Sequence, residues 1–156
     1  KFNKVFNFRL PTTKIDSLPF TDLIEKISDV YKKVEPEIIY MPFMYDVHTD
    51  HKTTAKAIHS TLKWFRYSHL KKVLMYETLS ETNLNFSEEN DFKPNLFVDI
   101  SEYLEKKLEI LRCYKTEFGK HPFPRSEEAI KAQAILRGSQ SGFKAAESFK
   151  LIFKKN

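Results

Sequence analysis

The sequence has almost no cysteine. Cys113 is the single one in 156 residues, which excludes an internal disulfide and suits a reducing cytoplasm. We interpret Cys113 as a small hydrophobic side chain on a helix, which is far more common than a reactive thiol. The sequence therefore predicts a cytoplasmic protein without covalent cross-links.

Long apolar runs are also missing. None approaches the ~18 residues that a membrane-spanning helix needs, and the N-terminus, Lys1-Phe2-Asn3-Lys4, lacks a signal-peptide core. Hydrophobic residues make up 41% of the chain, which is typical of a soluble globular protein with a real core. Because repeats, linkers and low-complexity segments are absent too, we expect one domain over residues 1–156 and no membrane span.

A basic stripe is the third missing feature. The formal charge is +5, but the lysines are spread along the chain apart from Lys71-Lys72 and Lys154-Lys155. A nucleic-acid groove needs basic residues interleaved with aromatic ones, and no such stripe occurs. We therefore interpret the excess charge as a solvated face and expect no nucleic-acid partner.

Strand and helix patterns alternate along the chain, which is typical of an α/β protein. Strand patterns cover residues 5–10, 37–41, 73–76, 96–100 and, weakly, 147–153. Helix patterns cover residues 20–34, 50–66, 101–111 and 126–138. Residues 78–93 are polar and aperiodic, which predicts a lid, a binding loop or a disordered segment. Strand, helix and strand in succession predict a right-handed parallel βαβ unit.

Turn and cap residues set the expected boundaries of these helices. Pro36 moves Glu35 out of helical geometry and ends the first helix. Ser101 and Ser126 are expected N-caps of the last two helices, and Gly138 is an expected end of the final one. On the helix over 50–66, the expected buried face is Ala55, Ile58, Leu62 and Phe65, and His59 is expected at or near the surface.

An aspartate and two histidines crowd the turn after the strand over 37–41. His48 and His51 stand three apart with Asp50 between them, at a place where open α/β sheets bind ligands. Neutral imidazole is a common zinc ligand, and a carboxylate can orient it. A polar loop whose histidines cap the next helix is an equally good interpretation of so short a motif.

The residues around this motif resemble a known family in order along the whole chain. The matching stretches are Met41-Pro42 with residues 46–51, Tyr76-Glu77, residues 93–101, 122–129 and 137–139, Gly142, and residues 146–149. They are similar to the zinc-dependent N-acetylglucosaminyl deacetylases, the PIG-L or LmbE-like family. The resemblance implies a three-layer, Rossmann-like, mostly parallel sheet with helices on both faces.

The resemblance also implies a function. It is hydrolysis of the N-acetyl group of an amino sugar or its conjugate, with a zinc-bound water attacking the amide carbonyl. His51 matches a metal ligand. His48 matches the histidine that faces substrate, which as imidazolium would stabilise the oxyanion or protonate the leaving amine, and Asp50 would orient it and keep it charged.

Three further residues are expected to bind substrate. Asp46 could ligate metal weakly, bond the sugar or brace the turn, with equal weight for each. Arg125 presents a fork that suits sugar hydroxyls or a phosphate, and a structural ion pair is an equal alternative. Glu77 follows a strand and is expected to face the cleft unless it forms a salt bridge.

One motif of the family is absent. Its first motif, His-Pro-Asp-Asp, supplies two zinc ligands and the general base, and no such string occurs here. We therefore expect an N-terminally incomplete domain with an incomplete zinc site, inactive by itself. A non-catalytic sugar- or partner-binding remnant is the alternative. A missing first strand would leave a sheet edge exposed, which is a route to homo-oligomers.

Overall fold

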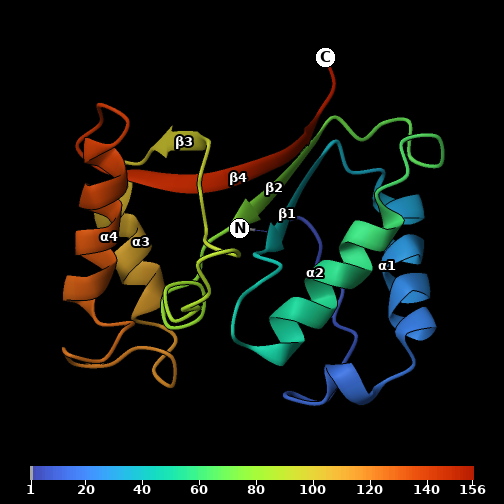
Figure 1. Ribbon diagram of the computed structural model, residues 1–156, viewed down its shortest axis with the longest axis horizontal. Coiled ribbons are helices and arrows are strands. Elements are labelled where there is room, and N and C mark those ends of the chain that lie inside the picture. The colour runs from blue at the N-terminus through green and yellow to red at the C-terminus, as the bar shows by residue number, and fades with distance from the viewer. Residues whose placement is uncertain (1) are drawn as a thin grey trace. The chain divides into compact units, whose positions relative to one another are not determined.

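The computed structural model describes residues 2–156 and divides into two compact units (Figure 1). The first unit consists of Lys1–Tyr76 and Leu151–Asn156, and the second of Glu77–Lys150. The elements in chain order are η1 (Ile15–Ser17), α1 (Phe20–Val34), β1 (Ile38–Pro42), α2 (Thr49–Thr61), β2 (Lys72–Tyr76), β3 (Leu96–Asp99), α3 (Leu104–Leu111), α4 (Glu127–Ser139) and β4 (Ala146–Lys154). The last strand, β4, contributes residues to both units.

The strands form a four-stranded sheet in the order β1-β2-β4-β3. β1 and β2 pair in parallel, from Ile38 opposite Lys72 to Pro42 opposite Tyr76. β3 and β4 pair antiparallel, with Leu96 opposite Phe149. The α/β class is thus confirmed, but the sheet is mixed rather than mostly parallel, because β4 returns along β3 at its edge.

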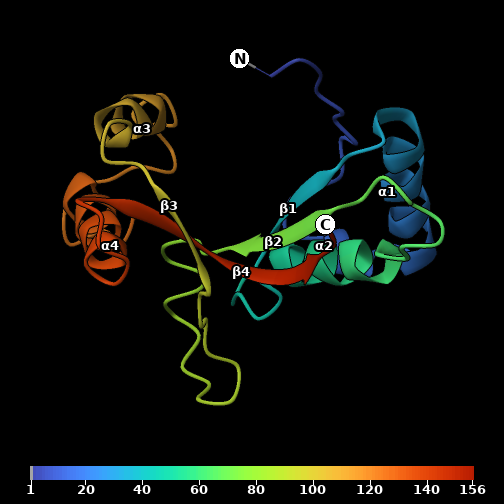
Figure 2. The same ribbon diagram turned by 90° about the horizontal axis from the view of Figure 1, so that it is seen from above.

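In the first unit, α1 lies beside α2, and α2 packs on β1 (Figures 1 and 2). The apolar stripe of α1 buries Leu23, Ile27 and Tyr31, as its three- and four-residue spacing predicts. The Tyr31 ring meets the ring of Tyr67 edge to face, with centroids 5.4 Å apart. The helix ends where predicted, because Glu35 adopts a left-handed conformation with φ of 47°.

Two predictions for the first unit are wrong. Residues 5–10 form no strand, since their backbone pairs with no neighbouring strand and Arg9 has a positive φ of 50°. Helix α2 ends at Thr61 instead of continuing to residue 66, because the C-cap residue Leu62 has a non-helical ψ of 60°. Phe65, expected in the core, is consequently exposed.

In the second unit, α3 and α4 lie side by side, and α4 also packs on β3 (Figure 2). Ser126 caps α4 as predicted, since its hydroxyl accepts a hydrogen bond from the Ala129 amide at 3.2 Å. Gly138 lies in the last turn of that helix, where a Cβ would stand 2.6 Å from the carbonyl oxygen of Phe143. Glycine is required there by this close approach of two backbone segments.

The other expected cap, Ser101, is not one. Its hydroxyl bonds the Asp99 carboxylate and accepts the Ala145 amide, while α3 begins after Tyr103.

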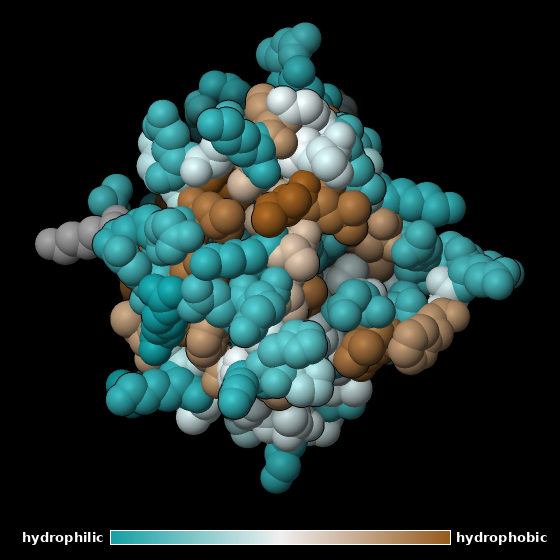
Figure 3. Space-filling view, turned by 90° about the vertical axis from the view of Figure 1, so that its left-hand side faces the viewer, coloured by the Kyte–Doolittle hydropathy of each residue, from teal (hydrophilic) through white to brown (hydrophobic). Residues whose placement is uncertain are grey.

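The polar stretch over residues 78–93 contains neither helix nor strand, as predicted. Figure 3 looks onto the side of α3 and α4 and shows hydrophobic side chains exposed among hydrophilic ones. Among residues 2–156, no helix is long and apolar enough to cross a membrane.

Candidate active site

The turn after β1 is built on buried apolar anchors. Met41 and Phe43 are 0% and 1% exposed, which fixes the end of the strand in the core. The Asp46 amide donates to the Phe43 carbonyl at 3.2 Å, closing the turn. Helix α2 then begins at Thr49, with His48 as its N-cap. Both histidines of the motif therefore lie at the carboxyl end of β1, as predicted.

His51 is held by a buried carboxylate. Its Nδ1 lies 2.8 Å from Oδ2 of Asp46, whose side chain is fully buried. A carboxylate at Nδ1 places the proton of a neutral ring on that nitrogen and the lone pair on Nε2. Metal-binding histidines are commonly oriented in this way. Of the three roles open to Asp46, the structure therefore favours bracing the turn, through His51.

His48 lies against His51 but is held differently. The two rings stack with centroids 5.0 Å apart and 22° between their planes. The Asp50 amide donates to His48 Nδ1 at 3.1 Å, so Nδ1 is the acceptor and a neutral ring carries its proton on Nε2. In this geometry His48 is the N-cap of α2, and Nε2 is the ring nitrogen left to donate a hydrogen bond.

Asp50 contacts His48 through its backbone amide, while its carboxylate, the group expected to orient His48, bonds another segment. Its carboxylate accepts the backbone amides of Thr13 at 2.7 Å and Ile15 at 3.2 Å. These bonds tie the segment before α1 to the first turn of α2, where the helix dipole also favours a negative charge. The role of Asp50 in this structure is therefore to join two segments of the first unit.

Tyr76 is a neighbour of the site that sequence analysis missed. It pairs in register with Pro42 at the carboxyl ends of the parallel strands β2 and β1. Burial raises its pKa, and the negative charge of Asp46 raises it further. The phenol therefore stays neutral near the buried carboxylate. The parallel register of neighbouring strand ends was the signal that could have identified it.

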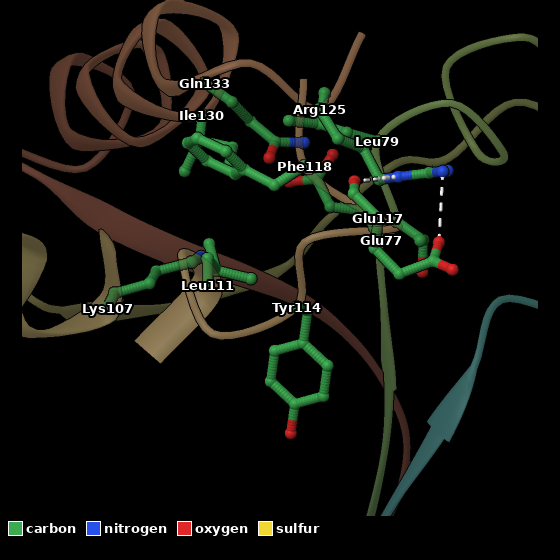
Figure 4. Close-up of a pocket in the computed structure, with 11 residues that line it drawn as sticks. Glu77, Leu79, Lys107, Leu111, Tyr114, Glu117, Phe118, Arg125, Ile130 and Gln133 are labelled. Atoms are coloured by element: carbon green, nitrogen blue, oxygen red, sulfur yellow. Dashed lines mark hydrogen bonds and ion pairs between the residues drawn. The ribbon is translucent and has the colours of Figure 1, made fainter. Parts of the chain in front are cut away.

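Glu77 and Arg125 belong to the second unit and line one cavity of about 190 Å³ (Figure 4). Leu111 of α3 and Ile130 of α4 contribute to its apolar walls, together with Phe118 from the intervening segment. The cavity thus contains two of the predicted substrate-binding residues.

The charges of both residues are already paired. Glu77 receives two hydrogen bonds from Arg137, at 2.7 and 2.6 Å, and a third from the Ser148 hydroxyl. Arg125 donates to the Glu117 carbonyl at 2.8 Å, lies 3.1 Å from the Glu117 carboxylate and bonds Ser80, as the dashed lines of Figure 4 show in part. For both residues the ion-pair alternative matches the structure.

The described residues do not complete a metal site. Across residues 2–156, no three His, Cys, Asp or Glu side chains come together as metal ligands. Catalytic zinc commonly has three protein ligands. The Asp46 carboxylate orients the His51 ring, but among the described residues no further metal-binding side chains gather beside it.

We compared the chain with known proteins by sequence and by structure. No protein-family model matches the chain. The chain is 28% identical over 144 residues to the diacetylchitobiose deacetylase of Thermococcus kodakarensis. The match covers 86% of this chain and 52% of that protein. The chain thus spans about half the length of this curated relative, and the resemblance to LmbE-like deacetylases is confirmed as distant homology.

Solved structures show the same fold. The N,N'-diacetylchitobiose deacetylase of Pyrococcus horikoshii, in complex with its inhibitor MPG, has a TM-score of 0.65 at 18% identity, over 92% of this chain and 55% of that one. The zinc-inhibited form of teicoplanin deacetylase Orf2 has a TM-score of 0.66 at 12% identity, over 97% and 57%. GalB of Pseudomonas putida, a 4-carboxy-2-hydroxymuconate hydratase, has a TM-score of 0.61 at 18% identity, over 87% and 60%. Since the fold also supports a hydratase, function must be argued from the site.

Proposed function

We propose that this chain is the His-x-Asp-His portion of a metal-dependent hydrolase that removes the N-acetyl group from an amino sugar or its conjugate. The observation that carries the proposal is the contact between His51 Nδ1 and the buried Asp46 carboxylate, with His48 stacked beside it. The sequence match to a diacetylchitobiose deacetylase supports the same reaction class. The structural likeness to deacetylases supports the fold that such a site would need.

Each residue of the turn has a proposed task. His51 would be a metal ligand, and Asp46 its positioning residue, which fixes the ring and its tautomer. His48 carries an Nε2–H that can donate to the oxyanion that develops when the amide is attacked. The backbone amide of Asp50 donates to His48 Nδ1 and so holds that ring at the N-cap. The Asp50 carboxylate accepts the Thr13 amide and so keeps the turn in place.

An imidazole ligand held by a carboxylate suits zinc, and His51 would be the ligand that this chain provides. Bound zinc supplies a water of lowered pKa. Its remaining ligands and the general base lie outside the residues described here. For Arg125 and Glu77 we propose that their ion pairs shape the second unit, and that a sugar contact by Arg125 would require it to exchange Glu117 for substrate.

The test pairs zinc content with amine release from N,N'-diacetylchitobiose, using the protein produced from its own gene. His48→Ala should retain zinc and lose about 10²–10³ in rate, the cost of removing an oxyanion donor. His51→Ala should lose both zinc and activity. His59→Ala is the matched control, because His59 is an exposed histidine on the same helix. Wild-type protein that releases no amine, or a His48→Ala variant of full activity, would contradict the proposal.

The second candidate is a sugar- or partner-binding protein without catalysis. It is favoured by the lack of a three-ligand metal cluster among residues 2–156. It predicts that N,N'-diacetylchitobiose shifts the His48 and His51 signals in NMR spectra, while zinc does not bind and amine is not released. Stoichiometric zinc with turnover would reject it.

A further inference from the structure

Two aromatic rings stand exposed on the segment between α2 and β2. Trp64 and Phe65 are 64% and 65% exposed. Their rings meet edge to face, with centroids 5.9 Å apart and 89° between their planes. An exposed apolar patch with a polar rim marks an interaction site more often than a lone exposed side chain does. We call residues 63–66, Lys63-Trp64-Phe65-Arg66, the aromatic turn.

The aromatic turn is fixed by its own hydrogen bonds and by buried neighbours. The Arg66 and Tyr67 amides donate to the Lys63 carbonyl, at 2.8 and 3.1 Å. Tyr67 and Leu70, which follow the turn, are 7% and 2% exposed and anchor the segment in the core of the first unit. The two aromatic rings are therefore displayed by a closed and anchored turn.

The surroundings of the aromatic turn are basic. Residues 62–72 contain no acidic side chain and four basic ones, Lys63, Arg66, Lys71 and Lys72. Lys155 adds a fifth cation, because its ammonium group bonds the Ser68 carbonyl and its amide bonds the Lys71 carbonyl at 2.9 Å. Lys71 is paired with Glu37 at 2.6 Å, whereas the two cations of the turn itself form no ion pair within residues 2–156.

Acidic side chains reach the turn from α1 without reversing this charge. Arg66 lines a groove together with Glu25 and Asp29, and Asp29 is paired with Lys32 at 3.3 Å. With Lys32 included, six cations stand near three carboxylates, which are those of Glu25, Asp29 and Glu37. The aromatic rings thus project from a surface of net positive charge.

We infer that the aromatic turn docks on an anionic membrane surface, with Trp64 and Phe65 inserted among the lipid headgroups. Tryptophan favours this zone because its ring is apolar and its indole N–H can still donate a hydrogen bond. The cations around the turn would lie on the lipid phosphates, where each contributes roughly a fivefold gain in binding. Buried apolar area and attraction to anionic lipid together hold proteins at a membrane surface.

The geometry of the two rings disfavours the other partners of a basic aromatic surface. Successive bases of a single strand stack on a series of aromatic faces, and rings at 89° to each other cannot both receive stacked bases or one flat sugar. A second copy of the chain would bring two basic surfaces together, and like charges across an interface are unfavourable. Insertion into a headgroup layer needs no parallel faces.

The aromatic turn is separate from the candidate active site. Helix α2 has 13 residues, so about 20 Å of helix lie between His48 at its N-cap and the turn beyond its other end (Figure 1). The inference therefore goes beyond the proposed function and uses none of its residues.

The experiment uses the fluorescence of Trp64 in the full 156-residue chain. Trp64 is the single tryptophan of the sequence, so its emission reports on the aromatic turn alone. The chain is mixed with vesicles of phosphatidylcholine, either pure or with one third phosphatidylglycerol. Co-sedimentation should show binding at least about tenfold tighter to the anionic vesicles. Trp64 emission should move to shorter wavelength, and acrylamide should quench it less.

Variants of equal net charge separate insertion from simple electrostatic adsorption. Trp64→Ala and Phe65→Ala should each weaken co-sedimentation with the anionic vesicles about tenfold, because each removes inserted apolar area. Phe86→Ala is the matched control and should leave binding unchanged, since Phe86 is 88% exposed in the second unit beside Glu88 and Glu89. Circular dichroism checks folding. If a variant does not fold, quenching of Trp64 in the wild-type chain by brominated lipid decides the matter.

A second pair of variants tests the charges. Lys63→Gln and Arg66→Gln should each weaken binding to the anionic vesicles roughly fivefold. Lys106→Gln, an exposed cation of the second unit, should have no comparable effect. Raising the salt concentration to ~0.5 M should also weaken binding of the wild-type chain, because exposed charges are then screened.

The inference is overturned if the chain does not bind the anionic vesicles. It is also overturned if Trp64→Ala and Phe65→Ala bind as well as the wild type, since net charge alone would then account for adsorption. A Trp64 response to single-stranded DNA, to N,N'-diacetylchitobiose or to the concentration of the chain itself, with none to vesicles, would identify another partner and overturn it too. None of these measurements uses zinc or amine release, so vesicle binding and deacetylation can fail independently.

Discussion

Replacing Arg137 by methionine should be among the most destabilising single changes in the second unit. The side chains of Arg137 and Glu77 are 16% and 12% exposed and joined by two hydrogen bonds. Arg137→Met keeps the length of the side chain but leaves a largely buried carboxylate whose remaining partner among the described residues is the Ser148 hydroxyl. Breaking such a pair typically costs about 3–5 kcal/mol of unfolding free energy. Glu77→Gln should cost less, about 2 kcal/mol, because Arg137 keeps a 2.9 Å bond to Gln140.

The assay is urea unfolding followed by circular dichroism, on both single variants and the double variant. The double variant should be no less stable than Arg137→Met alone, because without the arginine the charged carboxylate of Glu77 is destabilising. Lys106→Met is the control, since its ion pair with Glu109 is exposed to solvent and should contribute little to stability. If Arg137→Met costs no more than the control, or if the two single effects simply add, the pair does not stabilise the second unit as argued.

Three further predictions concern stability. Ser126→Ala removes the acceptor for the first turn of α4 and should cost about 1 kcal/mol in urea unfolding, with no loss if the cap is unimportant. Gly138→Ala places a Cβ 2.6 Å from a backbone oxygen and should cost about 1–3 kcal/mol; an unchanged unfolding midpoint would contradict the close approach. Burial raises the pKa of Tyr31 to about 12, above its value of ~10 in an unfolded chain. The folded state therefore holds this proton more tightly, and about 2–3 kcal/mol of stability, fully present below pH ~10, should be lost as pH rises to ~12. Tyr31→Phe should remove that loss and Tyr103→Phe, an exposed control, should not; equal alkaline unfolding of all three proteins would refute it.

Local patterns predicted the fold well where they act within one element. The spacing of Leu23, Ile27 and Tyr31 located α1, and Pro36 located its end. Sequence patterns failed where the outcome depends on neighbours. Residues 5–10 alternate like a strand, but a strand exists only when another strand pairs with it, and residues 4–8 make no backbone pairing here. The antiparallel pairing of β4 with β3 is likewise set by long-range contacts that no local pattern records.

In the candidate site, too, local patterns predicted some features and missed those that depend on neighbouring groups. The turn and the proximity of His48 and His51 followed from the strand–turn–helix pattern. The partner of each histidine did not, because a carboxylate two residues away in sequence was assumed to serve His48. In the structure Asp50 faces the Thr13 and Ile15 amides, and Asp46 serves His51. Spacing in sequence identifies the candidate groups, whereas the direction of each side chain depends on the turn.

The strand β4 makes the first unit discontinuous along the chain, which bears on the order of folding. The Lys155 amide bonds the Lys71 carbonyl at 2.9 Å, so the last residues complete a unit that began at the other end. Closing a loop of about 80 residues costs about 4 kcal/mol in chain entropy before any contact offsets it. During synthesis, residues 77–150 are made before those last residues, so the second unit is free to fold first and to shorten this loop. A nascent chain released before residue 151 would possess the histidine turn but lack the strand that completes its unit.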